Sequence, residues 1–433
     1  MSRKKVFTLA SSLLVLGGAL TGCGSSTTPA NNNTTVGSNS PAPVTITFWN
    51  AYSATDPEVS VLKKDIIPAF EKQYPYITVK DVEFPYDQMQ KKLLTSAAGA
   101  DLPDAARIDI IWTSQLAKLG ILVQQDQLAG FSALQSQVFK GPLSTATYNG
   151  HYFALPLDTN TKILFYNQAL FAKAGISGPP TSMTDMVQDI AKLSSGSGKN
   201  AVYGYALGGF DLWNAIPWIN SAGGSLLSPD MTKASGYLNS PETIAAVQQL
   251  ATMASQHQIS GFNNGDMSTS DGFAKGKYAM IDDGPWMDPI FAGQYPNFKY
   301  SKALWPAGTA GSVQVVGGEN IAIFNTDQAH QDAAWKFEQF MLSPTAQIAM
   351  AKVGQMPVLN NVSNDPQIQQ LGNMSLFLEQ LKTSASRPSI PQYSQVDQII
   401  MNAITQAVQG KVSVKTALDG AAQQVDQVLA SQS

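Results

Sequence analysis

Strand patterns and helix patterns alternate along residues 44–120 of this chain. The segment VTITFW at 44–49 has the two-residue alternation of a strand, and Asp56 followed by Pro57 is a helix start signal. The same patterns predict a strand at 77–84, a helix at 86–98, a strand at 108–112 and a helix that ends at Leu119. This β-α-β-α-β order predicts an α/β fold whose open, mostly parallel sheet has helices on both faces.

The residues that follow each predicted strand are candidate binding residues, because ligands of such sheets lie beyond the carboxyl ends of the strands. Asn50 and Tyr52 follow the first strand, and Trp112 and Ser114 lie at the end of the third. We expect these four side chains to face a ligand.

The length and the charge of the chain limit its class. Residues 44–433 exceed what one hydrophobic core usually organises, which predicts two lobes. The chain has 27 basic and 31 acidic residues without a basic stripe, so nucleic acid is not an expected partner. Asn, Gln, Ser and Thr are plentiful, which is compatible with a neutral polar ligand.

The N-terminus has the features of an export signal. Cationic residues at 3–5 precede a mostly apolar run at 6–20 that is too short and too interrupted for a membrane span. The run leads into Leu-Thr-Gly-Cys, which resembles a bacterial lipobox, and Cys23 is the only cysteine. We predict a lipoprotein signal peptide at 1–22 and a lipid anchor on Cys23. The uncharged residues that follow, up to position 43, predict a disordered tether.

Two further segments place polar or aromatic side chains where the chain turns. Residues 158–161, Asp-Thr-Asn-Thr, join two extended runs; this polar bridge predicts a crossing between lobes, and a plain loop is the alternative. In GKYAMIDDGPWMD at 276–288, an apolar run ends in Asp282 and Asp283, and Gly-Pro then places Trp286 on a turn. Trp286 either receives a ligand or folds back into the core.

Signatures of catalysis and of cofactor binding are poor. The histidines, His151, His257 and His330, have no zinc-type spacing, and no G-x-S-x-G, phosphate-loop or Ca²⁺-loop motif occurs. We therefore expect no enzyme activity, no cofactor and no metal. A glycoside hydrolase is the enzymatic alternative, with Asp282 or Asp283 paired with another carboxylate across a sugar bond.

Four segments, in this order, resemble one known family. They are LPLDTNTKILFYNQALFAKAGI at 155–176, GKYAMIDDGPWM at 276–287, VVGGENIAIF at 315–324 and AAWKFEQFMLSPTAQIAMAKVGQMPV at 333–358. The match is to the extracellular solute-binding proteins of ABC importers, family 1, the maltose-binding-protein-like group. The resemblance implies a periplasmic-binding-protein-like α/β fold with two discontinuous lobes joined by a hinge. Lobe 1 would comprise 44–158 and 310–360, and lobe 2 would comprise 161–309 and 361–433.

The resemblance also implies roles for individual residues. Asp211 corresponds to an acid that accepts sugar hydroxyls, Trp213 to an aromatic plate and Trp286 to a second plate on the GPW turn. Asn160 takes the place of a carboxylate, and Asp397 stands where maltose binders have an aromatic residue. The two departures suggest a different or shorter sugar. For Asp211 a helix N-cap is the structural alternative.

The expected binding set also contains Asp158, Asp283, Gly318, Glu319, Arg387 and Tyr393. Tyr393, with Arg387 close by, is a candidate for the missing aromatic plate. Gly318 lies at the second crossing, where the backbone can approach a ligand closely. Which of the two acids before Gly284 faces the cleft stays open.

The other tryptophans divide into two groups. Trp49, inside a strand pattern, and Trp335, inside an amphipathic helix pattern, are expected in the core. Trp218 and Trp305 have no assigned role.

These observations predict a substrate-binding lipoprotein of an ABC importer that captures a mono- or oligosaccharide between its lobes. Its partners would be the carbohydrate, the permease subunits and, through the lipid anchor, the outer face of the cytoplasmic membrane of a Gram-positive cell. A monomer is expected. The alternatives are a binding protein for a polyol, a glycerophosphodiester or a small peptide, the glycoside hydrolase, and a purely structural surface lipoprotein.

Overall fold

The computed structural model describes residues 41–52, 57–99, 101–372 and 374–431. The predicted signal peptide, the lipidation site Cys23 and the tether up to residue 40 lie outside the described residues, as does Asp56. All described helices and strands belong to one compact unit, Ala42–Ser433. Within the described ranges, no helix is both long and apolar enough to cross a membrane.

The first sheet contains the parallel strands that the sequence predicts. Its order is β13 (Ala385–Ser386), β12 (Val315–Ile323), β3 (Ala105–Asp109), β1 (Val44–Asn50) and β2 (Ile77–Glu83), with β6 (Leu155–Thr161) paired to β12. Strand β1 pairs in parallel with β2 and β3, whereas β12 is antiparallel to β3 and β6. The sheet therefore combines a parallel half with an antiparallel edge.

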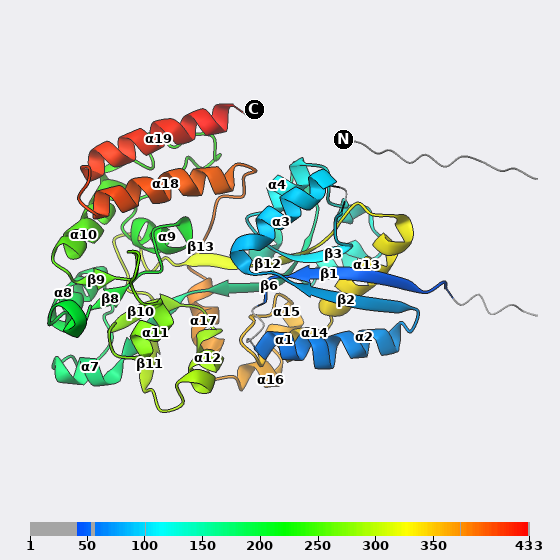
Figure 1. Cartoon of the computed structure of the whole chain (residues 1–433), viewed down its shortest axis with the longest axis horizontal. Coiled ribbons are helices and arrows are strands. Elements are labelled where there is room, and N and C mark those ends of the chain that lie inside the picture. The colour runs from blue at the N-terminus through cyan, green and yellow to red at the C-terminus, as the bar shows by residue number, and fades with distance from the viewer. Residues whose placement is uncertain (1–40, 53–56, 100, 373, 432–433) are drawn as a thin grey trace, which may run out of the picture. The chain divides into compact units, whose positions relative to one another are not determined.

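The second sheet is formed by residues from the middle of the chain. Its order is β11 (Tyr300–Ala303), β7 (Ile163–Asn167), β10 (Met280–Asp283), β8 (Tyr205–Ala206) and β9 (Ile259–Ser260). A separate hairpin contains β4 (Thr147–Tyr148) and β5 (His151–Tyr152). Figure 1 shows both sheets with helices packed around them.

The helices come in three runs along the chain. Before β6 lie α1 (Pro57–Val61), the π-helical turn η1 (Leu62–Ile66), α2 (Ile67–Gln73), α3 (Tyr86–Gly99), α4 (Thr113–Lys118), the 3₁₀ turn η2 (Gln125–Gln127), α5 (Phe131–Gln135) and α6 (Lys140–Ser144). Between β7 and β11 lie α7 (Gln168–Lys173), α8 (Met183–Leu193), the 3₁₀ turn η3 (Gly198–Asn200), α9 (Leu212–Ser221), α10 (Pro241–Ser255), α11 (Thr269–Ala274) and α12 (Met287–Gln294). After β12 lie α13 (Gln328–Met341), α14 (Pro344–Ala351), α15 (Asn360–Ser363), α16 (Pro366–Gln369), α17 (Met374–Leu381), α18 (Tyr393–Val408) and α19 (Val414–Ala430).

Alternation along β1 places apolar side chains on both faces of the first sheet. Phe48 packs edge-on against Phe337 of α13, with ring centroids 5.1 Å apart. Trp49 points to the opposite face and lies 4.8 Å from Phe84. Trp49 and Trp335 are both buried, so the prediction that these two tryptophans belong to the core is confirmed.

Strand β3 ends three residues earlier than the sequence suggested. The predicted strand at 108–112 is wrong, because β3 ends at Asp109 and the chain turns there. The Asp109 carboxylate accepts the Ile111 N–H at 3.0 Å, and its carbonyl accepts the Trp112 N–H at 2.9 Å. An aspartate that satisfies the backbone two residues ahead favours a turn over a strand.

The polar bridge at 158–161 is part of a strand. Every residue of β6 is buried, and Asn160 pairs with Gly317 while Thr159 pairs with Gly318 of β12. The plain-loop alternative is therefore wrong. The chain passes from β6 into β7, and so from the first sheet into the second, at Lys162. The lobe boundaries stay a prediction; β13, inside the range assigned to lobe 2, pairs with β12 of the first sheet.

Candidate functional site

A cavity of about 700 Å³ collects side chains from both sheets and from the helices that flank them. Most of the expected binding residues line it: Tyr52, Trp112, Asn160, Asp211, Trp213, Trp286, Gly318, Glu319, Arg387 and Tyr393. The lining also includes residues outside the expected set: Ala51, Pro57, Glu58, Tyr86, Asp87, Gln90, Arg107, Asp109, Ile111, Ile290, Gly317, Gln355, Ser394, Asp397 and Gln398. Its volume suits a small-molecule ligand.

Two tryptophans form one aromatic wall of the cavity. Trp213, in the first turn of α9, and Trp286, at the start of α12, stack with ring centroids 6.5 Å apart and ring planes 28° apart. A Cβ atom at position 284 would lie 2.2 Å from the Trp286 ring, so only glycine allows the indole to lie over the turn. The GPW turn thus holds a half-buried indole at the cavity.

Strand β12 brings its backbone close to this wall. A Cβ atom at Gly317 would lie 2.2 Å from Asn160 Oδ1 and 2.6 Å from the Trp213 ring. Gly318 has φ +126°, a conformation that side chains other than glycine rarely adopt. Both glycines are therefore required where β12 approaches β6 and α9.

Asn160 presents an unsatisfied amide to the cavity. Only 6% of Asn160 is exposed, and its Oδ1 atom has no hydrogen-bond partner among the described residues. A buried polar atom without a partner destabilises the fold unless a ligand or water satisfies it.

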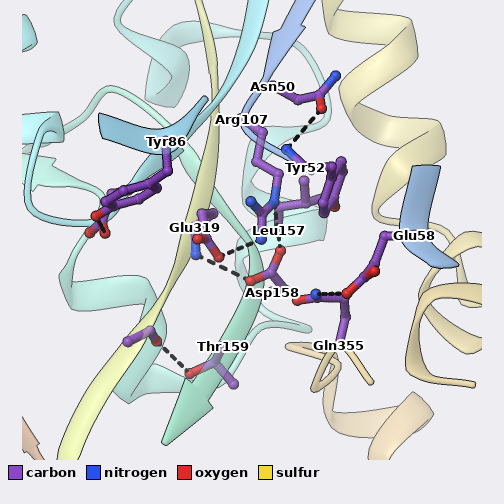
Figure 2. A network of polar contacts seen from close by, with 12 residues as sticks. Asn50, Tyr52, Glu58, Tyr86, Arg107, Leu157, Asp158, Thr159, Glu319 and Gln355 are labelled. Atoms are coloured by element: carbon purple, nitrogen blue, oxygen red, sulfur yellow. Dashed lines mark hydrogen bonds and ion pairs between the residues drawn. The ribbon is translucent and has the colours of Figure 1, made fainter. Parts of the chain in front are cut away.

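Arg107 forms the centre of a buried charge network at the carboxyl end of β3, shown in Figure 2. Its Nε donates to Asp158 at 3.2 Å and its Nη2 donates to Glu319 at 2.6 Å. The Tyr52 ring lies 4.2 Å from the guanidinium carbon, a cation–π contact. Burial raises the pKa of Glu319 well above its usual range, although Arg107 opposes the shift.

A second network joins distant parts of the chain across the cavity. Arg387 Nη2 donates to Asp109 at 2.9 Å, and the Tyr86 hydroxyl donates to the other oxygen of Asp109. Tyr86 in turn packs against Trp112, with ring centroids 5.4 Å apart. On another side, Gln355 donates to Glu58 at 2.8 Å, which Figure 2 also shows.

Sequence reasoning missed Arg107 and Asp109, both of which lie on β3. Because the strand was predicted to end at Trp112, the residues from Trp112 onward were the predicted candidates. The strand β3 ends at Asp109, and it is the side chains of its last three residues that include two lining residues of the cavity. An Asp followed by two apolar residues at the end of a strand pattern was the signal that could have placed the turn.

Asp211 and Asp397 lie together at the start of α9. Asp211 is the N-cap, since its Oδ1 accepts the Asn214 N–H at 3.0 Å, and it also lines the cavity. The alternative that Asp211 is a helix N-cap is therefore confirmed, and the residue also remains part of the cavity lining. Asp397 Oδ1 accepts the Leu212 N–H at 2.7 Å. Burial raises the pKa of Asp211, and burial raises the pKa of Asp397 to about 6.

Four residues of the expected binding set do not line the cavity: Asn50, Ser114, Asp158 and Asp283. Asn50 is fully buried, donates to Asp81 at 2.6 Å and accepts the Tyr52 N–H at 3.1 Å. Ser114 is buried and bonds Ser389 at 3.2 Å. The polar atoms of these two residues bond within the fold, and their predicted contact with a ligand finds no support in the cavity lining.

The two remaining acids, Asp158 and Asp283, lie outside the cavity lining and bond to residues of the fold. Asp158 positions Arg107 and accepts the Glu319 N–H at 3.3 Å. Asp283 accepts the N–H of Gly284, and burial raises its pKa to about 6. Its neighbour Asp282 is a structural acid.

Asp282 is held from three sides. Its Oδ2 atom lies 2.7 Å from the Lys162 ammonium and accepts from Gln314 at 3.0 Å, and Tyr205 donates to Oδ1. Lys162 also lies 5.2 Å from the centroid of the Trp213 ring. The ion pair of Lys162 and Asp282 therefore packs against Trp213, one of the two tryptophans of the aromatic wall.

The two unassigned tryptophans are core residues. Trp218 and Trp305 are almost fully buried and pack edge-to-face, with centroids 5.6 Å apart. Within the described part of the chain, no group of three or more His, Cys, Asp or Glu side chains is arranged to hold a metal ion.

Comparisons with known proteins agree with this architecture. A family model described as bacterial extracellular solute-binding protein matches residues 65–375. The chain is 26% identical over 392 residues to a putative binding protein of Brucella abortus, covering 87% of this chain and 91% of that protein. It is 27% identical over 316 residues to a maltotriose-binding protein of Pyrococcus abyssi, covering 66% and 62%.

The fold also matches solved structures. An ABC transporter solute-binding protein from Thermotoga lettingae, bound with α-D-tagatose, superposes with a TM-score of 0.78 at 26% identity. The match covers 89% of this chain and 99% of that one, so it includes both sheets.

Proposed function

This chain belongs to the bacterial extracellular solute-binding proteins, and we propose that its cavity captures a carbohydrate and delivers it to an ABC importer. The relatives with named ligands include proteins that bind maltotriose and tagatose. The ligand is a neutral or amine-bearing sugar of one to a few rings, since the cavity is of small-molecule size.

The observation that supports a sugar most directly is the aromatic wall of Trp213 and Trp286 beside hydrogen-bonding groups. Sugar rings have apolar C–H faces that stack on indoles, and a rim of hydroxyls that both donate and accept hydrogen bonds. Asn160, Asp211 and Arg387 line the same cavity and match that rim.

Binding is expected to favour closure of the two lobes. The lining combines Arg107 and Glu319 from the first sheet with Trp213 and Trp286 from elements of the second. A ligand contacts all of them only when the two sides are together, so it stabilises the closed form.

A phosphate-bearing ligand is not favoured. Phosphate recognition needs cations that are free to bind its oxygens. Both arginines of the lining are already paired, Arg107 with Asp158 and Glu319, and Arg387 with Asp109. A linear polyol has hydroxyl groups that can bond to the polar groups of the lining, but it has no sugar ring that could stack on the two tryptophans.

No catalysis is proposed. A glycoside hydrolase would need two carboxylates that face one sugar bond. Asp282 is engaged by Lys162 and Gln314, and Asp283 lies outside the lining. Incubation with oligosaccharides is expected to leave them intact, and the appearance of products would contradict this assignment.

The test is a titration of the purified protein with glucose, galactose, maltose, maltotriose, cellobiose, their aminated counterparts, ribitol, glycerophosphocholine and a tripeptide. We expect at least one sugar to give a saturable change in tryptophan emission, because Trp213 and Trp286 line the site, and a matching heat in isothermal titration calorimetry. Saturable binding of only the polyol, the phosphodiester or the peptide would overturn the carbohydrate assignment.

A further inference from the structure

The acidic and basic groups that line the cavity do not balance. The lining contains the carboxylates of Glu58, Asp87, Asp109, Asp211, Glu319 and Asp397 but only two guanidinium groups. Arg107 is neutralised by Glu319 and by Asp158 behind it, and Arg387 is neutralised by Asp109. The lining thus contains more carboxyl groups than cationic groups.

Two of these acids, Asp211 and Asp397, flank the same helix start. Asp211 accepts the Asn214 N–H, and Asp397 accepts the N–H of Leu212, so both carboxylates flank the first turn of α9. Neither forms an ion pair with any residue that the structure describes. In each case only Oδ1 accepts a hydrogen bond from the described residues, which leaves Oδ2 for a ligand.

We propose that the sugar captured by this protein carries a protonated amine, and that Asp211 and Asp397 bind the ammonium group between them. This inference rests on the carbohydrate function proposed above and specifies the chemical class of the sugar. An ammonium group donates three hydrogen bonds, and its bonds to carboxylates are stronger than those of a neutral hydroxyl.

The surroundings of the pair agree with this ligand. Burial raises the pKa values of both carboxyl groups, whereas the charges of Lys162 and Arg387 lower that of Asp211 and the charge of Arg387 lowers that of Asp397. These two cations form their ion pairs with Asp282 and Asp109, so a ligand ammonium would be the direct partner of Asp211 and Asp397. The buried Oδ1 of Asn160, which has no partner, lies beside Trp213 and supplies one more acceptor. The guanidinium carbon of Arg387 lies 5.3 Å from the Trp213 ring, but Asp109 already balances its charge.

The proposal is tested with sugars that differ only in one substituent. Glucosamine is compared with glucose, galactosamine with galactose, and the β-1,4-linked glucosamine disaccharide with cellobiose, by calorimetry at near-neutral pH and low salt. At least one aminated sugar is expected to bind about tenfold more tightly than its hydroxyl counterpart. Its N-acetylated form is expected to lose that advantage, because acetylation removes the charge.

Two isosteric variants locate the effect. Asp397→Asn and Asp211→Asn are each expected to reduce the ratio of the amine's affinity to that of its hydroxyl counterpart to about twofold or less. Asparagine can keep both backbone hydrogen bonds, including the N-cap, so the variants should fold. Asp185→Asn, which removes one exposed carboxylate of α8 far from the lining, is the matched control and should keep the preference.

The outcomes separate this inference from the function on which it rests. If neutral sugars bind and no aminated sugar binds more tightly, the ammonium site is wrong and the carbohydrate function stands. If the preference exists but survives both asparagine variants, the pair is not its source. If neither kind of sugar binds, the carbohydrate function itself fails.

Discussion

At the scale of single residues, Trp286 has the placement that its turn suggested. Its indole covers Gly284 and packs partly against the core, yet it also lines the cavity. The residue thus combines partial core packing with a place in the cavity lining. The role of Trp286 as a plate for a sugar ring stays a prediction.

Trp286→Ala is expected to weaken sugar binding at least tenfold, because the ring that stacks on the sugar is removed. The free energy of unfolding should fall by only about 1–2 kcal/mol, since the side chain is half-buried. Calorimetry and thermal unfolding measure the two quantities. Trp305→Phe, in the core, is the control: it should lower stability and keep affinity. A Trp286→Ala protein that binds sugar normally would contradict the stacking role.

Asp397 is expected to make the unliganded protein less stable as pH rises. Burial raises its pKa from the ordinary value of 3.8 to about 6, so the folded state binds more protons than the unfolded state between these values. Stability contributed by this group is therefore present below about pH 4 and lost by about pH 6. In the folded protein, the charges of Asp211 and Asp109 raise the pKa of Asp397 further, and the charge of Arg387 lowers it.

Asp397→Asn removes this titration. Compared with the parent protein, the variant should be more stable by on the order of 1–2 kcal/mol at neutral pH, with the difference vanishing near pH 4. Denaturant unfolding across that pH range measures the difference. If the variant and the parent protein have the same free energy of unfolding at neutral pH, ionised Asp397 does not destabilise the folded state and the prediction is wrong.

At the scale of elements, the site depends on where β3 ends and on how closely the first half of β12 approaches β6 and α9. The turn at Asp109 ends β3 early and places Arg107 and Asp109 at the cavity. Strand β12 pairs with β3 on one side and β6 on the other, so it brings Gly317 and Glu319 to the same place. Neither the strand end nor this antiparallel pairing could be derived from the local alternation of residues.

Gly317→Ala tests the close approach of β12. The added methyl group would lie 2.2 Å from Asn160 Oδ1 and 2.6 Å from Trp213, so both side chains must move. We expect a loss of stability of about 1–3 kcal/mol and at least a tenfold loss of sugar affinity. Gly420→Ala, in α19 with no atom near the new methyl group, is the control and should bind normally. Normal affinity in Gly317→Ala would show that the approach is not needed for binding.

At the scale of the whole molecule, contacts across the cavity join segments that are distant in sequence. Arg387 bonds Asp109, Gln90 donates to Ser394 at 2.9 Å, and Ser114 bonds Ser389. These bonds link β3, α3 and α4 with the segment that enters α18. The predicted lobe boundaries place these contacts between the lobes, so we predict that opening of the lobes breaks them.

The lipid anchor is a prediction for the whole molecule. Cys23→Ala is expected to release most of the exported protein from the membrane fraction into the medium, because the thiol that carries the lipid is gone. Fractionation and immunoblotting of the producing cells measure this. Ser25→Ala, two residues further along, should leave the protein with the membrane. Membrane retention of Cys23→Ala would contradict lipidation at this residue.

The α/β class and the family follow from the sequence alone, and the GPW turn points to Trp286 as a candidate aromatic residue of the site. The alternation of strand and helix patterns is local, and the GPW turn depends on neighbouring residues, so both can be derived without tertiary contacts. The family resemblance, and not these local patterns, suggested Trp213, Trp286, Asp211 and Tyr393, all of which line the cavity.

Which polar residues line the cavity, and which bond to the fold behind it, depends on tertiary contacts. Asn50, Ser114, Asp158 and Asp283 carry suitable groups at suitable places in the sequence, yet other parts of the fold engage or enclose them. Arg107 reaches its partner Glu319 across 212 positions of the chain. Whether a polar atom is free for a ligand depends on such long-range partners, and no local pattern encodes them.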